Sequence, residues 1–539
     1  MENFITKIEN FRIFHTGLLN GRKKILKINK YVLDLLLTVG YVVLIVNGDA
    51  LAAEVKHNVL KVRSTLESDL VNLDPAKLTT SQDRTVAQQV FQGLVTFDTT
   101  AKPPYPVVPL LAESYEVSKD GKVITFKLRQ GVQFHGGYGE LTSEDVVFTI
   151  QRHLNPKVGS LAKSELEDVE RVEAPDKYTV RIYLKISSAL TLLQNLAWQN
   201  AGSILSKKAA EKLGDKIQSM PIGTGPFYFE KWNVAEKVIL RKFPHYWRTP
   251  AKIDEVEFWV IPEEIVALGA LEKGDLEIVP ITQMGSLSRA KMIKNISIVA
   301  AKGDIYQYIT YINHKMKPMD DLRVRRALAY AMDIKGINAR IGELVMPFPS
   351  PLPPAVFAAT DEFWPYKYDL NKAKQLLAEA GYPKGFELTV IYKRGILYEP
   401  IALELQNCWN KIVNVKLELL ESATYLNRLK AYKYHITPWG LGRMAPYLFA
   451  QAYETGSPRN FSQYSNPEID AIINKAKTAT TVEKAREYWR EFQKKANEDV
   501  VNLVPAVGRS LAAMSNKVKG VIVMPFSRMV DLERAYIIQ

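Results

Sequence analysis

The 539-residue chain has a single cysteine, Cys408, so it can form no internal disulfide and contains no C-x-x-C metal or redox motif. Cys408 lies in an amphipathic stretch, where we expect a buried thiol. Hydrophobic residues make up 47% of the chain and charged residues 24%, which excludes a disordered chain and a polytopic membrane protein. At roughly 100–200 residues per domain, the length predicts several packed units or one large multi-lobed body.

The sequence also lacks the common motifs of catalysis. It contains no G-x-x-x-x-G-K-[ST] loop, no H-E-x-x-H and no G-x-S-x-G, and Gly223-Thr224-Gly225 lacks the third glycine of a dinucleotide fingerprint. None of the seven histidines lies three to five residues from another, so a local metal-ligand pair is missing. A metal site assembled from distant segments stays open. We therefore predict a protein that is not an enzyme and has no cofactor or bound metal.

The formal net charge of +13 would permit binding to nucleic acid or to anionic surfaces. Basic residues are spread along the chain, however, and no helix-turn-helix, RNP motif or arginine-rich arm is recognisable. We predict no nucleic-acid partner.

The N-terminal residues have the pattern of a secretory signal. Several lysines and an arginine precede the apolar run Tyr31–Val46, and Ala50-Leu51-Ala52-Ala53 follows. The run contains Asp34 and is shorter than the roughly 20 residues of a membrane-spanning helix, which disfavours the alternative of an uncleaved anchor. We predict a signal peptide at 1–52, cleaved after Ala52, and a periplasmic protein. No cysteine follows the cleavage site, so we do not expect a lipoprotein.

Strand and helix patterns alternate along the rest of the chain. Val59–Ser64 alternates as a strand does, and Asp120-Gly121 is typical of a hairpin turn. Asn466-Pro467 predicts a helix start, and Val482–Asn497 has helical periodicity. These patterns predict an α/β body of interleaved lobes.

Six blocks, in order, carry a resemblance to a known family: Leu73–Ala76 with Gln92–Val95, Pro109–Arg152, Gly223–Phe227 with Tyr246-Trp247, Asp321–Asp333, Tyr368–Pro383 and Tyr464–Asp470. They resemble the peptide/nickel family, family 5, of extracytoplasmic solute-binding proteins of ATP-binding-cassette (ABC) importers. Within the third block we expect Gly223 and Gly225 to be needed for freedom in φ rather than for phosphate binding.

The resemblance implies a two-lobed periplasmic binding protein of the large kind (cluster C, type II) with an additional third domain. After the signal peptide it implies domain I at 53–98, 191–305 and 506–539, the extra domain II at 99–190, and domain III, the second lobe, at 306–505.

The implied function is that of a monomeric binding subunit of an ABC importer. It would capture a peptide or peptide-like solute in a cleft between the lobes and deliver it to the membrane permease and its ATPases. Alternatives within this class are haem, a metal chelate, an opine-like compound or an oligosaccharide. Less favoured are a periplasmic chaperone or adhesin and an unrecognised enzyme.

The segment Trp439–Arg443 aligns with the family's cleft segment. Peptide binders commonly have W-x-x-D here, the aspartate pairing with the ligand's amino group, whereas this chain has Gly442 at that position and Arg443 next. A guanidinium favours a carboxylate or another anion. We therefore predict that Trp439, Gly442 and Arg443 line the cleft and that the ligand carries an anionic group. The alternatives are a surface arginine and a tryptophan in the core.

The resemblance places seven more candidates at the cleft. Thr79 and Thr80 lie in a cleft-lining loop, although capping of the following helix explains them equally well. For His135 a structural role is favoured over ligand binding. Phe134 and Tyr138 come from the block Pro109–Arg152. Tyr308 and Asn313 come from the strand that leads into the second lobe.

Overall fold

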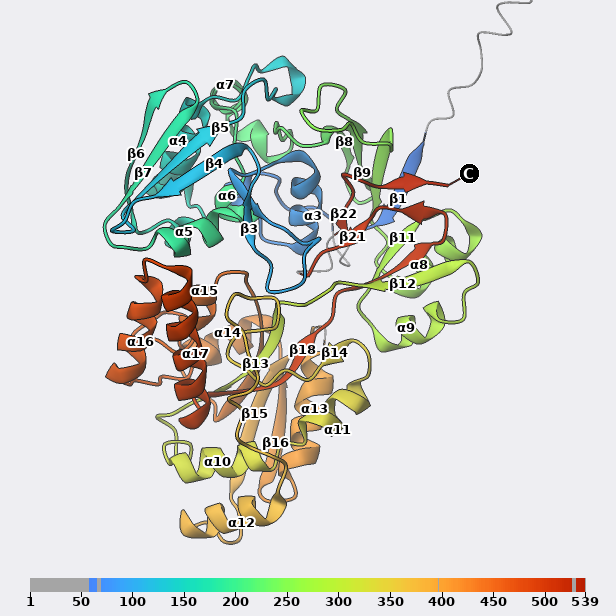
Figure 1. Ribbon diagram of the computed structural model, residues 1–539. Coiled ribbons are helices and arrows are strands. Elements are labelled where there is room, and N and C mark those ends of the chain that lie inside the picture. The colour runs from blue at the N-terminus through green and yellow to red at the C-terminus, as the bar shows by residue number, and fades with distance from the viewer. Residues whose placement is uncertain (1–57, 65–68, 396, 526–529, 539) are drawn as a thin grey trace, which may run out of the picture. The chain divides into compact units, whose positions relative to one another are not determined.

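The first described strand, β1 (Val59–Arg63), pairs with strands from a much later part of the chain. In the computed structural model, which describes residues 58–64, 69–395, 397–525 and 530–538, β1 lies parallel to and between two strands of a seven-stranded sheet. The predicted signal peptide and its cleavage site lie outside the described residues. The order of the sheet (Figure 1) is β12 (Ile296–Ala300), β19 (Leu511–Ser515), β11 (Ile278–Ile281), β1, β10 (Glu255–Trp259), β9 (Lys237–Lys242) and β8 (Phe227–Asn233).

A four-stranded antiparallel sheet forms a separate core, around which α4 (Ser143–Leu154) packs. Its order is β4 (Ala112–Val117), β5 (Val123–Leu128), β7 (Thr179–Leu184) and β6 (Val169–Asp176). The predicted hairpin turn joins β4 to β5, and Gly121 in it has φ 67°, a conformation that glycine adopts without strain.

A six-stranded mixed sheet lies in the C-terminal half. Its order is β14 (Val345–Met346), β18 (Asn502–Gly508), β13 (Tyr306–Ile312), β17 (Ile436–Gly442), β15 (Glu387–Lys393) and β16 (Asn414–Leu420). Three two-stranded pairs complete the strands of the described residues: β2 (Val95–Phe97) with β3 (Val107–Pro109), β20 (Val518–Lys519) with β23 (Tyr536–Ile537), and β21 (Ile522–Val523) with β22 (Val530–Asp531).

Several helices begin at side chains that cap them. The Thr80 hydroxyl accepts from Asp83 N at the start of α3, and Asn466 Oδ1 accepts from Glu468 N at the start of α16. Cys408 is buried on α13, as predicted. Besides α4, the helices are α3 (Ser81–Val90), α5 (Ala189–Leu196), α6 (Gln199–Gly202), α7 (Lys207–Leu213), α8 (Glu264–Lys273), α9 (Met284–Ala290), α10 (Leu322–Tyr330), α11 (Ile334–Ile341), α12 (Leu370–Glu379), α13 (Tyr398–Trp409), α14 (Ser422–Lys430), α15 (Pro446–Ala450), α16 (Pro467–Lys477) and α17 (Val482–Glu498).

The chain crosses between the seven-stranded and six-stranded sheets twice, at 301–305 and at 509–510. The two crossings are hydrogen-bonded to each other: Ala301 N donates to Ser510 O at 3.0 Å, and Ser510 N donates to Asp304 Oδ1 at 2.8 Å. Paired crossings of this kind can absorb the backbone rotation of a hinge. The fold is α/β, as predicted. Residues 58–539 form one unit, so the domain boundaries within it stay a prediction.

Candidate ligand-binding site

Gln92, just after α3, joins the first and the third of the blocks that carry the family resemblance. Its Nε2 donates to Tyr246 Oη at 2.8 Å, and its Oε1 accepts from Trp247 Nε1 at 2.8 Å and from Thr224 Oγ1 at 3.2 Å. The amide is buried, so each of these bonds satisfies a group that has no access to water. These hydrogen bonds hold the motif residues of the framework together.

The turn that contains Gly223 and Gly225 packs against α3 and His135. A Cβ at Gly223 would lie 2.1 Å from Val90 O, and one at Gly225 would lie 2.4 Å from Gln89 O. Neither glycine has a positive φ, so the expectation that they serve φ freedom is wrong. They are needed because any side chain would collide with the backbone of α3.

His135, one of the predicted site residues, is fully engaged with this turn. Its Nε2 lies 2.9 Å from Gly225 O, and its Nδ1 accepts from Gly223 N at 3.4 Å. Burial lowers the pKa of His135 to about 4, so the ring is neutral with its proton on Nε2. Because both nitrogens are occupied, the surroundings match the structural alternative.

A two-pronged ion pair ties the first motif block, at Leu73–Ala76, to the end of the second, Pro109–Arg152. Arg152 donates from Nη1 to Asp74 Oδ1 at 2.8 Å and from Nη2 to Oδ2 at 2.6 Å. Asp74 is completely buried and also accepts from Ala76 N. The pair therefore fixes α4 against the loop that leads to α3.

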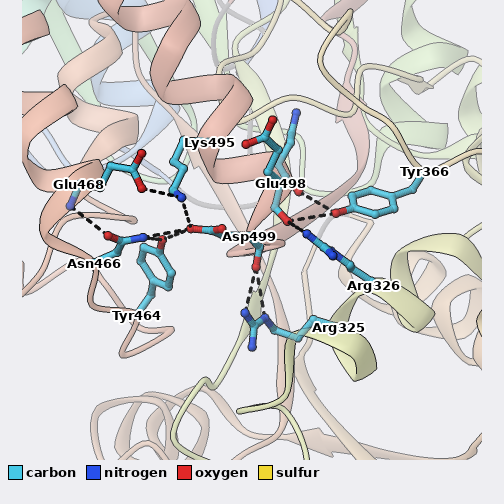
Figure 2. A network of polar contacts seen from close by, with 10 residues as sticks. Arg325, Arg326, Tyr366, Tyr464, Asn466, Glu468, Lys495, Glu498 and Asp499 are labelled. Carbon is cyan, nitrogen blue, oxygen red and sulfur yellow. Dashed lines mark hydrogen bonds and ion pairs between the residues drawn. The ribbon is translucent and has the colours of Figure 1, made fainter. Parts of the chain in front are cut away.

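Two further motif blocks meet at the C-terminal end of α17 (Figure 2). Asp499 Oδ2 accepts from Tyr464 Oη at 2.6 Å and from Asn466 Nδ2 at 3.1 Å. Arg325 donates to the carbonyl of Asp499, and Arg326 donates to the carbonyl of Glu498. Arginines at this position satisfy carbonyls that a helix end leaves free and complement its dipole. Residues of these two motif blocks thus have a structural role.

The predicted cleft segment Trp439–Arg443 forms the end of β17 and the residue after it. Tyr306 on the neighbouring strand β13 lies over its glycines. A Cβ at Gly442 would be 2.8 Å from Tyr306 Cδ2, and a Cβ at Gly440 would be 2.1 Å from Tyr306 Oη. The tyrosine ring occupies the space that a side chain at 442 would need, which is a physical reason for the missing aspartate.

Trp439 is partly exposed and has aromatic rings beside it. It stacks on Tyr425 with an interplanar angle of 6° and a centroid distance of 6.0 Å, and Phe461 lies at the same distance. Lys393 Nζ lies 5.2 Å from the centre of the indole, and burial lowers the pKa of this lysine. The surroundings leave part of the indole available to a ligand.

Thr79 and Thr80 both interact with Asp83. The Thr80 amide donates to Asp83 Oδ2 at 2.9 Å, which with the reciprocal bond to the Thr80 hydroxyl completes a capping box. Thr79 is exposed, and its hydroxyl donates to the same carboxylate at 3.2 Å. The capping alternative accounts for Thr80, and Thr79 keeps an exposed face.

The four remaining candidates have contacts with other residues of the protein. Phe134 is part of the core of the four-stranded sheet, and Tyr138 lies beside Lys212 at 5.5 Å. Tyr308 is buried between Tyr306 and Tyr398. Asn313 donates to the carbonyls of two residues, 432 and 434, and its Oδ1 accepts from two more groups. The structure does not test the role of any of them in binding.

The sequence analysis missed a cluster of charged residues around Arg443. Its members are Arg84 on α3, Glu165 in the helical turn Lys163–Glu165, and Arg459 between α15 and α16. The three arginines are partly buried, and Glu165 is 7% exposed. Sequence offered no local signal for the cluster, since its members come from four distant segments.

Electrostatic interactions link the charges of these groups. Burial, and then the charge of Arg443, lowers the pKa of Arg84 to about 10 and lowers that of Arg459. Burial raises the pKa of Glu165, although the charges of all three arginines act in the opposite direction. Arg443 and Glu165 are therefore the centre of the cluster.

Hydrogen bonds through α5 and α6 hold two of these residues. Arg84 Nε donates to Asn200 Oδ1 at 3.0 Å, and Asn195 Nδ2 donates to the backbone carbonyl of Glu165 at 2.8 Å. Both asparagines are buried. The first two charged residues thus belong to one rigid part of the framework.

Contacts with α16 occur next to Glu165. Lys477 Nζ at the end of α16 lies 3.1 Å from Asp168 Oδ2, and Thr191 Oγ1 on α5 donates to Lys477 O at 3.3 Å. Lys477 also lies 4.5 Å from the ring centre of Tyr447, four residues after Arg443. These contacts bring the segments of Glu165 and Arg443 together.

A separate cavity of about 340 Å³ lies beside β2 and α6. Its lining carries two arginines, Arg248 and Arg534, and three carboxylates, Asp98, Asp531 and Glu533. It contains none of the site residues predicted from sequence. Burial raises the pKa of Asp531 to about 6.

Within residues 58–64, 69–395, 397–525 and 530–538, no helix combines the length and apolar character needed to cross a membrane. In the same ranges, no group of three or more histidine, cysteine, aspartate or glutamate side chains is placed to hold a metal ion.

Comparison with known proteins matches residues 106–463 to the model of bacterial extracellular solute-binding proteins, family 5. Heme-binding protein A of Haemophilus influenzae is 29% identical over 483 residues, covering 82% of this chain and 85% of that protein. The glutathione-binding protein GsiB of Pectobacterium atrosepticum is 29% identical over 491 residues, covering 87% of this chain and 92% of that protein.

Among solved structures, the periplasmic binding protein DppA from Helicobacter pylori, in complex with the peptide STSA, is similar with a TM-score of 0.73. The two chains are 27% identical, and the match covers 89% of this chain and 98% of that one. With the family model, these matches show that the chain belongs to family 5 of the bacterial extracellular solute-binding proteins, the solute-binding proteins of ABC importers.

Proposed function

We propose that this protein captures a peptide or peptide-like solute with an anionic group between its lobes and delivers it to the permease of an ABC importer. The solute is bound and released without chemical change. Signal-peptide cleavage after Ala52, a periplasmic location, the domain boundaries expected from sequence and a monomeric state are part of this proposal.

The observation that carries the proposal is the incomplete hydrogen bonding of the Arg443 guanidinium. Its Nη1 donates to the carbonyl of Gly442 at 2.8 Å, while its Nε is buried and has no hydrogen-bond partner. A buried donor without a partner costs about 1–3 kcal/mol, and a ligand carboxylate would supply the acceptor. Because Gly442 brings no carboxylate, the amino group of a peptide would find no partner at that position.

The nature of the relatives supports a peptide-like solute. The Helicobacter pylori protein is described in complex with a peptide, and the Pectobacterium protein is described as glutathione-binding. The Haemophilus influenzae relative is described as heme-binding, so haem, which also carries carboxylates, is the second candidate.

Titration calorimetry with a mixture of di- and tripeptides tests the proposal. We expect the wild-type protein to bind, and Arg443→Ala to weaken binding by about tenfold or more, the loss of a charge-assisted hydrogen bond. The matched control is Arg171→Ala, which removes an arginine that is half exposed on β6 and pairs with Glu173 at 2.9 Å. Binding that survives Arg443→Ala would remove the anionic-group assignment, and a protein that binds haemin but no peptide would replace the peptide by haem.

A further inference from the structure

The cluster around Arg443 carries more positive charge than one carboxylate can neutralise. The charges of three arginines, Arg84, Arg443 and Arg459, act on the single carboxylate of Glu165. Among the described residues, none of the three arginines forms an ion pair, and the side chain of Arg459 has no hydrogen bond. The hydrogen-bond acceptors of Arg84 are all neutral: Asn200 Oδ1 and the carbonyls of residues 78 and 79.

Buried arginines elsewhere in the described chain have their charge or donors satisfied. Arg63 lies 3.5 Å from a carboxylate oxygen of Glu264 and donates to backbone carbonyls. Arg152 forms the two-pronged pair with Asp74. Arg443, with its buried unpartnered Nε, and Arg459 therefore differ from these inner arginines, and Arg443 lies in the segment that aligns with the family's cleft.

The hydrogen bonding of the Glu165 carboxylate is incomplete as well. Its side chain is 7% exposed, and its Oε2 has no hydrogen-bond partner among the described residues. A buried carboxylate oxygen without a hydrogen-bond partner can accept a further hydrogen bond. The cluster thus offers guanidinium donors for anions and one acceptor for an N–H group.

We propose that Arg84, Arg443 and Arg459 bind two carboxylates of one solute and that Glu165 accepts a hydrogen bond from an N–H group of the same molecule. This inference rests on the proposed function and specifies its ligand as an acidic peptide or an amino dicarboxylate. The planar guanidinium suits a carboxylate because two parallel N–H groups can reach its two oxygens.

Calorimetry with two dipeptides of equal shape tests this. Ala-Glu has two carboxylates, whereas Ala-Gln has one and is otherwise nearly identical. We expect the wild-type protein to bind Ala-Glu at least about tenfold more tightly than Ala-Gln, because a second charge-assisted pair forms only with Ala-Glu. The same titrations on Arg459→Gln should show a preference reduced to about twofold or less.

Two control variants distinguish ligand binding by Arg459 from a purely structural role of this residue. Arg459→Lys keeps the charge and should retain part of the preference, and Arg171→Gln should leave both affinities unchanged. If both dipeptides bind equally well, the inference fails while the proposed function stands. If neither binds and no other peptide binds, the peptide function itself fails. A preference for Ala-Glu that survives Arg459→Gln would remove Arg459 from the site.

Discussion

The packing of Tyr306 over the glycines of β17 makes Gly440→Ala a sharp test of the structure. The new Cβ would lie 2.1, 2.6 and 2.7 Å from three atoms of the Tyr306 ring. To admit the methyl group the ring has to shift from its place over Gly442 and beside Tyr308, whose ring centre is 5.4 Å away. Overpacking of this kind costs about 1–3 kcal/mol, and three contacts below 3.0 Å place the expected loss near the upper end.

Urea unfolding of four proteins measures this effect: wild type, Gly440→Ala, Tyr306→Ala and the double variant. We expect the two substitutions to be coupled by about 2 kcal/mol, since the methyl group fits once the ring is removed. The matched control is Gly269→Ala on α8, where nothing lies within 4 Å of the new Cβ. That substitution should raise stability by about 0.5–1 kcal/mol through helix propensity. A Gly440→Ala protein as stable as the wild type would refute the reasoning.

Three further predictions concern charged and titrating groups. Asp74→Ala should lower the free energy of unfolding by about 3–5 kcal/mol, because it leaves Arg152 without its partner. The double variant Asp74→Ala, Arg152→Met should lose clearly less free energy of unfolding than the sum of the two single losses. Full additivity of the losses would contradict the ion pair. His135, with a pKa of about 4 in the folded state, binds a proton only in the unfolded chain between pH 6.5 and 4, so stability falls as the pH falls through this window. His135→Gln should reduce that dependence by up to about 1.4 kcal/mol per pH unit, and an unchanged slope in urea titrations would contradict it. Arg459→Gln should raise the melting temperature of the ligand-free protein, because it removes repulsion from Arg443, whereas a lower value would indicate a structural role.

Features set by neighbouring residues were predictable from sequence. The hairpin at Gly121 and the helix start at Asn466 depend on short-range backbone chemistry. The strand β18 was harder to predict, because all seven of its residues are buried and it contains Pro505 and Gly508, so it shows no alternation of polar and apolar residues.

The candidate site was predictable only where the family resemblance marked it. Arg443 was found through the missing aspartate at Gly442, whereas Arg84, Glu165 and Arg459 became visible only when the fold brought four segments together. His135 illustrates the reverse case: its place in the strongest block reflects its bonds to the glycine turn.

A crystal structure of the protein grown with Ala-Glu is the most direct test of the central claim, that the unbalanced arginine cluster recognises the solute. We predict that one carboxylate of the peptide lies within about 3 Å of the Arg443 guanidinium and the other within the same distance of Arg84 or Arg459. Peptide density in the cavity beside Arg248 and Arg534, with the cluster unliganded, would contradict this account.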